Sequence, residues 1–169
     1  MSLISVSFRW HMAHILDLHF SPCARLHGHS YNIEVQLSGE VNKDGMVMDF
    51  GEVKDIISNK FDGWDHRVLL PWNKTGPYLG FCTTPEEKAE QMMEPKYMSF
   101  AAEHGTYIFP AIDCVLIPDI KNTTAEELSR YMFGRITEIL PVTKVIVRET
   151  ESNYAEYNRL MYDGETRTL

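Results

Sequence analysis

Three histidines near the start of the chain have the residue type and the spacing of a metal site. His27 and His29 are two positions apart, so on an extended strand both imidazoles point to the same face of a sheet. His14 ends the preceding apolar run, and a hairpin connection between Ala13 and Leu26 would place it beside the pair. Three neutral imidazoles with an open fourth position are the ligands of a catalytic zinc ion, whereas structural zinc sites are usually closed by four protein ligands. The pattern therefore predicts Zn²⁺ at these histidines.

Two further histidines in this region are not predicted to bind the metal. His11 has the opposite strand parity to His14, so we expect it to be an ordinary sheet histidine. His19 lies in the connection between the two strands, where a solvated loop histidine is the default. A His-x-His pair alone is a weak signal, because two histidines also meet by chance on a polar strand face.

Acid and base candidates accompany the histidines. Cys23 lies four residues before His27, and a nearby cation or metal lowers a thiol pKa, so that a thiolate base forms near neutral pH. The alternative for Cys23 is a small buried hydrophobe. Asp65 precedes His66, and a carboxylate that orients an imidazole makes it a tunable acid or base. Glu149 ends an apolar strand and suits recognition of a guanidine-like edge through two hydrogen bonds.

Composition restricts the class of protein. With 169 residues, of which 44% are hydrophobic, the chain can form one substantial core, and we expect a single domain over residues 1–169. A formal charge of -8 without a Lys/Arg cluster argues against nucleic acid or an anionic membrane surface as a partner. We find neither an apolar run of roughly 18 to 20 residues nor a signal peptide, so a cytoplasmic location is expected. Three cysteines, an odd number without paired spacing, predict reduced thiols.

Hydrophobic periodicity predicts strand, strand, helix, a long elaboration, helix, strand and strand. The predicted strands are Leu3–Ala13, Tyr31–Glu40, Val142–Glu149 and Tyr154–Tyr162. One helix runs over Phe50–Lys60 behind a cap at Asp49, and a second begins after Thr123 and Thr124 and is closed by Pro141. The second helix has an apolar stripe made of Leu128, Tyr131, Met132, Ile136, Ile139 and Leu140. This order predicts an α+β fold, in which two helices cover one face of a four-stranded antiparallel sheet.

The elaboration over residues 72–118 is irregular and rich in proline. Thr84 followed by Pro85 predicts the start of a short helix. A connection of this length is typical of a lid or an interface element, with disorder as the alternative.

Several motifs in this order resemble those of the 6-pyruvoyltetrahydropterin synthase / 6-carboxytetrahydropterin synthase family. The motifs are Trp10-His11-Met12-Ala13-His14, Cys23-Ala24-Arg25-Leu26-His27-Gly28-His29, Met48-Asp49-Phe50, Trp64-Asp65-His66, Asn122-Thr123-Thr124-Ala125-Glu126 and Arg148-Glu149-Thr150. The Cys-x-x-x-His-Gly-His element with an upstream Ala-His is highly specific. The resemblance covers roughly residues 1–70 and 119–162 and leaves the elaboration unmatched.

This resemblance implies the tunneling fold, in which three subunits close their sheets into a barrel and two trimers stack as a hexamer with active sites between subunits. It implies a 7,8-dihydroneopterin triphosphate substrate and no external redox cofactor. It also implies a role for each matched residue. The implied zinc ligands are His14, His27 and His29, the implied base is Cys23, the remaining acid/base pair is Asp65 and His66, the pterin anchor is Glu149, and Thr123 and Thr124 line the pterin pocket.

Within the family, the bacterial 6-carboxytetrahydropterin synthase branch is the first choice, because a single thiol-based site with no second partner motif is typical of it. That branch supplies queuosine biosynthesis and releases acetaldehyde as well as triphosphate. The same residues could serve 6-pyruvoyltetrahydropterin formation. An alternative of another class is a zinc- or pterin-binding protein without turnover, but a pure binder needs none of Cys23, Asp65 and His66.

Overall fold

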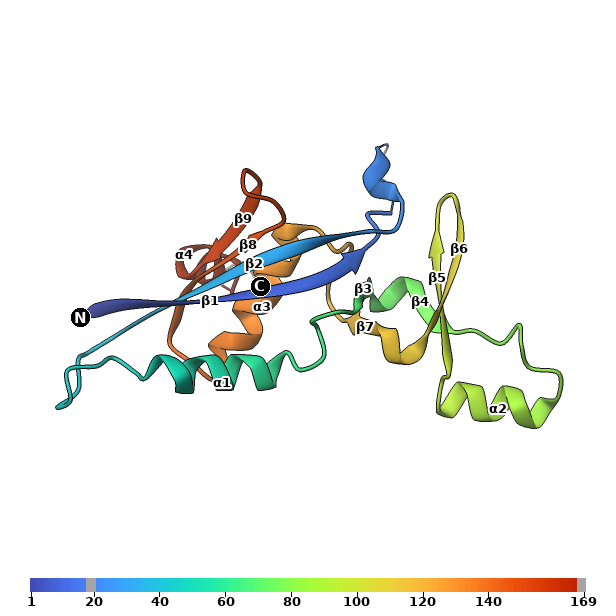
Figure 1. Ribbon diagram of the computed structural model, residues 1–169, viewed down its shortest axis with the longest axis horizontal. Coiled ribbons are helices and arrows are strands. Elements are labelled where there is room, and N and C mark those ends of the chain that lie inside the picture. Colours follow the sequence, from blue (N-terminus) through green and yellow to red (C-terminus); the bar gives the residue numbers. More distant parts are fainter. Residues whose placement is uncertain (18–20, 167–169) are drawn as a thin grey trace. The chain divides into compact units, whose positions relative to one another are not determined.

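The computed structural model describes residues 1–17 and 21–166, in two compact units (Figure 1). The first unit comprises Met1–His11, His29–Asp65 and Thr124–Leu169, and the second comprises Met12–Gly28 and His66–Thr123. Strands β1 (Ser2–His14) and β2 (His27–Gly39) each contribute residues to both units. The elaboration predicted over residues 72–118 lies wholly within the second unit.

In the first unit the strands are ordered β1-β2-β8-β9, where β8 is Val142–Arg148 and β9 is Tyr154–Asn158. Strands β2, β8 and β9 pair antiparallel, with Asn32 opposite Arg148. Alternate residues of β2 are buried, because one face of the sheet carries the core. The buried residues of this face include Ile33, Val35, Leu37, Val145 and Val147.

Two capped helices complete the core of the first unit, as the sequence predicts. Helix α1 (Phe50–Lys60) begins where the Asp49 side chain accepts a hydrogen bond from the Glu52 N–H, at 3.0 Å. Helix α3 (Ala125–Thr137) is capped by Thr124 and packs against β8 and β9. The predicted α3 stripe is wrong at Ile139, which is 44% exposed because the helix stops at Thr137, whereas Leu140, the last residue of the stripe, is buried.

In the second unit, the last residues of β1 are followed by strands that the sequence did not predict. Ala13 pairs with Val68 of β3 (Val68–Pro71), and β3 pairs with β7 (Cys114–Ile117), both in the parallel sense. The sheet is therefore larger than the predicted four strands and is not entirely antiparallel. The α+β class is confirmed.

The elaboration is ordered and has its own small sheet. Strands β4 (Thr75–Pro77), β5 (Tyr97–Ala102) and β6 (Gly105–Pro110) pair antiparallel. Helix α2 (Pro85–Met93) carries the capping box expected at Thr84. Single 3₁₀ turns follow β3 and β6, over Trp72–Lys74 and Ala111–Asp113. A core made of Ile15, Leu70, Met98, Phe100 and Cys114 joins this sheet to the strands before and after it.

The last predicted strand is wrong in its second half. β9 ends at Asn158, and helix α4 (Arg159–Thr166) follows instead of extended chain to Tyr162. The physical reason lies in Asn158, whose side-chain oxygen accepts hydrogen bonds from the N–H groups of Leu160 and Met161. Such a side chain satisfies the free donors of a first helical turn. Among the residues that the structure describes, no helix is long and apolar enough to cross a membrane.

The cap of α1 provides a test of the first unit's stability. Asp49→Ala removes the acceptor of the Glu52 N–H, so the free energy of unfolding should fall by about 1 kcal/mol in urea denaturation. Asp55→Ala is the control, because Asp55 is exposed in the middle of α1 and alanine favours a helix interior. Equal stabilities of the two variants would contradict the capping role.

Candidate metal centre

Three imidazoles meet where β1 ends and β2 begins. The ligand nitrogens of His14, His27 and His29 all lie within 4.8 Å of one another. His14 is fully buried, and its ring centroid is 4.4 Å from that of His27. This cluster could hold a metal ion, and its all-imidazole composition suits zinc, copper, iron or nickel more than the oxygen-preferring magnesium and calcium.

Backbone carbonyls orient two of the imidazoles. The Nδ1 atom of His14 donates to the carbonyl of Thr123 at 2.8 Å, and Nδ1 of His27 donates to the carbonyl of Arg25 at 2.7 Å. A carbonyl oxygen can only accept, so the proton of each neutral ring is on Nδ1 and the lone pair is on Nε2. Metal-binding histidines are usually fixed in this way. The donor set therefore fits a metal ion without rearranging its tautomers.

Gly28 allows β1 and β2 to approach closely beside the cluster. A Cβ atom at this position would lie 2.9 Å from the carbonyl oxygen of Met12, which is closer than real Cβ contacts allow. The residue between His27 and His29 is therefore restricted to glycine by the backbone of β1. The glycine of the His-Gly-His sequence is the signal of this close approach.

A set of hydrogen bonds holds Thr123, whose carbonyl accepts from His14, in place. Thr123 is fully buried, and its hydroxyl donates to the carbonyl of Ile15 at 3.4 Å. Asn122 accepts from the Thr123 N–H at 3.0 Å and donates to the carbonyl of Asp17 at 2.9 Å. The buried Asp17 carboxylate in turn accepts from Lys74 at 2.6 Å and from the Glu103 N–H at 2.8 Å. The elaboration is thereby connected to the segment that holds His14.

The two threonines that the family resemblance assigns to the pterin pocket have structural contacts in this chain. The Thr123 carbonyl accepts from His14, and the Thr124 hydroxyl accepts from the Glu127 N–H at the start of α3. The sequence reasoning missed the supporting roles of Asp17 and Asn122. No local pattern predicts these roles, because the bond of Asn122 to Asp17 and those of Asp17 to Lys74 and Glu103 join residues far apart in the sequence.

Cys23 lies in a 3₁₀ turn over Pro22–Ala24 and is half-buried. Its N–H donates to the Ser21 hydroxyl at 3.1 Å, and its carbonyl accepts from the Leu16 N–H at 3.0 Å. These bonds fix the backbone of Cys23, which lies beyond the end of β1, and thereby restrict the position of its thiol. Cys114, by contrast, is in the core, where burial first and then the charge of Asp113 raise its pKa to about 11. It therefore stays a thiol at neutral pH and is no candidate base.

The predicted acid/base pair, Asp65 and His66, lies in the connection between helix α1 and strand β3. The Asp65 carboxylate accepts a hydrogen bond from the His11 N–H at 2.7 Å. His66 has φ 64°, in the left-handed region that non-glycine residues rarely occupy. Such backbone strain is often found at functional sites.

The His11 ring does not belong to the cluster of His14, His27 and His29: its Nδ1 is 2.9 Å from the Ser30 hydroxyl. His19 lies outside the described residues.

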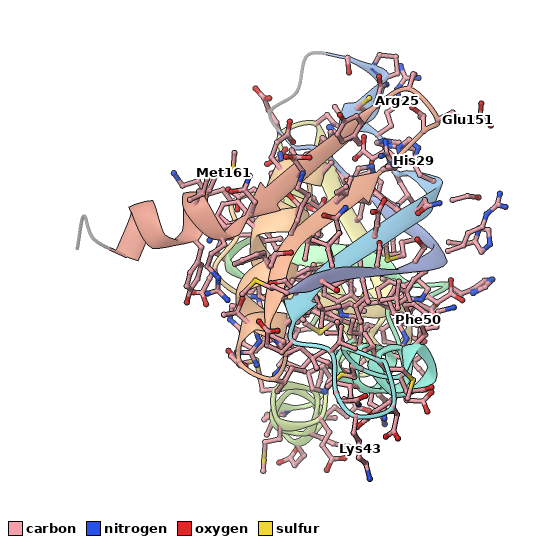
Figure 2. All side chains as sticks on the ribbon, turned by 90° about the vertical axis from the view of Figure 1, so that its left-hand side faces the viewer. Arg25, His29, Lys43, Phe50, Glu151 and Met161 are labelled. Atoms are coloured by element: carbon pink, nitrogen blue, oxygen red, sulfur yellow. The ribbon has the colours of Figure 1, made fainter. Side chains whose placement is uncertain are left out.

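Glu149 follows β8 in the first unit. Asn32 pairs with Arg148, so Tyr31 is opposite Glu149, and the start of β2 lies beside the end of β8. Figure 2 shows His29 and Glu151 at the same end of this unit. Burial above all, and then the charge of Glu149 and a hydrogen bond to it, raise the Tyr31 pKa far above its ordinary value. Glu149 also lines a cavity of about 510 Å³ together with Arg9, Ser30, Asn32, Arg148, Thr150 and Glu151.

Comparison with known proteins places the chain in a family. The profile of the family described as 6-pyruvoyl tetrahydropterin synthase matches residues 3–160. The chain belongs to this family. A 6-carboxy-5,6,7,8-tetrahydropterin synthase from Haemophilus influenzae is 30% identical over 161 residues, which cover 91% of this chain and 96% of that protein. A putative enzyme of the same name from Methanocaldococcus jannaschii is 33% identical over 138 residues, covering 81% of this chain and 76% of that protein.

Solved structures agree with the fold of the 6-pyruvoyl tetrahydropterin synthase family. The 6-pyruvoyltetrahydropterin synthase of Plasmodium vivax superimposes with a TM-score of 0.67 at 23% identity, over 94% of this chain and 99% of that chain. The Caenorhabditis elegans enzyme of the same name gives 0.59 at 22% identity, over 94% and 95%. The α+β fold with this family's topology, predicted from the motifs, is confirmed.

The assignment of His14, His27 and His29 as metal ligands can be tested by substitution. We expect the purified protein to contain about one zinc ion per chain, by elemental analysis, and His27→Ala or His29→Ala to lose it, because two imidazoles remain of a three-ligand site. His11→Ala is the matched control, since this histidine is on the same strand as His14 but outside the cluster. A folded His27→Ala protein that keeps a full equivalent of zinc would show that the ligands are misassigned.

Proposed function

We propose that this protein is a zinc-dependent pterin synthase that acts on 7,8-dihydroneopterin triphosphate. The observation that carries the proposal is the cluster of His14, His27 and His29, in which two rings are oriented with Nε2 available. It occurs in a chain similar along most of its length to proteins named 6-carboxy-5,6,7,8-tetrahydropterin synthase.

The proposed reaction consumes the triphosphate ester and water. It gives 6-carboxy-5,6,7,8-tetrahydropterin, acetaldehyde and triphosphate, the reaction that supplies queuosine biosynthesis. The first side-chain carbon stays on the pterin as the carboxylate, and the other two leave as acetaldehyde. Each step needs protons to be moved at carbon and oxygen, and none needs an external redox cofactor.

Separate residues would perform proton transfer and metal binding. When bound, zinc supplies Lewis acidity that makes hydroxyl groups and the C–H groups beside them more acidic. Cys23 is proposed to remove a proton as thiolate, and Asp65 with His66 to return or relay one. Three imidazoles already satisfy the protein's part of an open catalytic site, and a fourth ligand from Cys23 would close it.

Glu149 is proposed to anchor the pterin ring, because a carboxylate can accept two hydrogen bonds from the guanidine-like edge of a pterin. Its hydrogen bond to Tyr31 supports this role, because it places the carboxylate on the face of β2 that also carries His29. Glu149 also borders a cavity of about 510 Å³ that is lined by Arg9 and Arg148, whose guanidinium groups suit a polyanionic substrate. Thr123 and Thr124 remain proposed contributors to the pterin pocket.

A second reaction on the same substrate is 6-pyruvoyltetrahydropterin formation. The family description and a Dictyostelium discoideum relative named 6-pyruvoyl tetrahydrobiopterin synthase favour it; that relative is 38% identical over 67 residues, covering 40% of this chain and 50% of that protein. Both reactions release triphosphate, whereas the mass of the pterin product and the presence of acetaldehyde separate them. A protein that binds zinc and pterin without turnover would release no triphosphate.

The roles can be separated by two substitutions measured in the same assay. Cys23→Ala should keep its zinc and its pterin affinity but release triphosphate more slowly by a factor of about 10² or more, as when a positioned general base is removed. Glu149→Ala should weaken substrate binding and leave the metal content unchanged. Cys82→Ala is the control, because Cys82 is also a free, half-buried cysteine. If Cys23→Ala loses zinc in step with activity, the cysteine is a ligand and the proposed mechanism fails.

We also propose that copies of the chain assemble into a hexamer of two trimers. Strands β9 and β7 are the outer strands of the described sheet, so each has an edge that a neighbouring copy can pair with. Light scattering at micromolar concentration should give about six times the chain mass. A monomer under these conditions would contradict the assembly.

A further inference from the structure

Tyr31 contacts two groups of the candidate site within the first unit. It is fully buried, and its ring centroid is 5.5 Å from that of His29, with the two planes at 81°. Its hydroxyl is hydrogen-bonded to the side chain of Glu149. One side chain therefore touches both a proposed metal ligand and the proposed pterin anchor.

The backbone determines this arrangement. His27, His29 and Tyr31 alternate along β2, so they share one face of the sheet. The antiparallel pairing of Asn32 with Arg148 then places Tyr31 directly opposite Glu149. Directly opposite residues of paired strands have Cβ atoms about 5 Å apart, which is within reach of a phenol and a carboxylate.

The hydrogen bond between Tyr31 and Glu149 has a defined donor and acceptor. A tyrosine hydroxyl has a single proton to donate, and a carboxylate has two oxygens that accept. When one oxygen is held by a buried donor, the rotation of the carboxylate is restricted and its remaining lone pairs stay available to a ligand. Burial strengthens such a bond, because water does not compete for it.

We propose that Tyr31 is a positioning residue that fixes the Glu149 carboxylate in the orientation that the pterin ring requires. This inference rests on the proposed function of Glu149 and extends it by a residue that does not itself touch the substrate. The ring of Tyr31 packs against His29, whereas the hydroxyl acts on Glu149. The two parts of the side chain can therefore be separated by substitution.

Tyr31→Phe removes the hydroxyl and keeps the ring. We expect its zinc content to equal that of the unsubstituted protein, and its affinity for neopterin, followed by pterin fluorescence on the zinc-loaded protein, to fall about 10- to 100-fold, as for loss of a hydrogen bond to a charged group. In the triphosphate-release assay KM should rise by a similar factor, while kcat changes less than about threefold. Tyr157→Phe is the control, because Tyr157 is a buried tyrosine of β9 that packs on Phe133.

A double-mutant cycle with Glu149→Gln tests whether Tyr31 acts through Glu149. If it does, adding Tyr31→Phe to Glu149→Gln should weaken neopterin binding by less than about threefold, because coupled substitutions are not additive. Losses that multiply in the double variant would overturn the inference, as would unchanged neopterin affinity of Tyr31→Phe. Loss of zinc from Tyr31→Phe together with its affinity would also overturn it, since the residue would then act on the metal site.

The same titrations distinguish this inference from the proposed function. Neopterin binding that depends on Tyr31 and Glu149 as described, without any triphosphate release, would overturn the proposed reaction and support the inference. An unsubstituted, zinc-loaded protein that does not bind neopterin would overturn both.

Discussion

The close approach of β1 and β2 at Gly28 determines where the three imidazoles can meet. A side chain at this position would collide with the Met12 carbonyl, so the strands would separate beside the cluster. His14 and His27 could then not keep their rings 4.4 Å apart. Their Nδ1 atoms are held by carbonyls in the surrounding backbone, so the orientation of the ligands depends on the fold. Two of the three imidazoles are therefore oriented by the protein itself, which would lower the cost of ordering them around a metal ion.

The alternation of side chains along β1 and β2 determines which polar residues of the first unit lie on the same face of the sheet. His29, Tyr31 and Glu149 share the face that also carries the core, whereas His11 and Ser30 bond to each other on the opposite face. This division explains why His14 of β1 belongs to the histidine cluster and His11 does not. It also allows Tyr31, on the same strand as the proposed metal ligands His27 and His29, to hold the proposed pterin anchor Glu149.

Local signals predicted much of this structure, and long-range pairing accounts for most of what they missed. Helix α1 has the predicted bounds because Asp49 caps it, and the meeting of His14, His27 and His29 follows from strand parity and one hairpin. Asn158 ends β9 through a side-chain bond to α4, where periodicity alone continued the strand. The parallel pairing of β3 with β7 joins segments that are separated by residues 72–113, which is most of the elaboration. The Tyr31–Glu149 pair depends on the register of β2 against β8, which no local pattern in either strand specifies.

Zinc K-edge X-ray absorption of the purified protein tests the central claim most directly, because it reports the atoms bound to the metal. An open site made of His14, His27 and His29 predicts three imidazole nitrogens at about 2.0–2.1 Å, one further oxygen or nitrogen, and no sulfur. A sulfur neighbour at about 2.3 Å would contradict the account, because Cys23 would then be a ligand of a closed site and could not serve as the base.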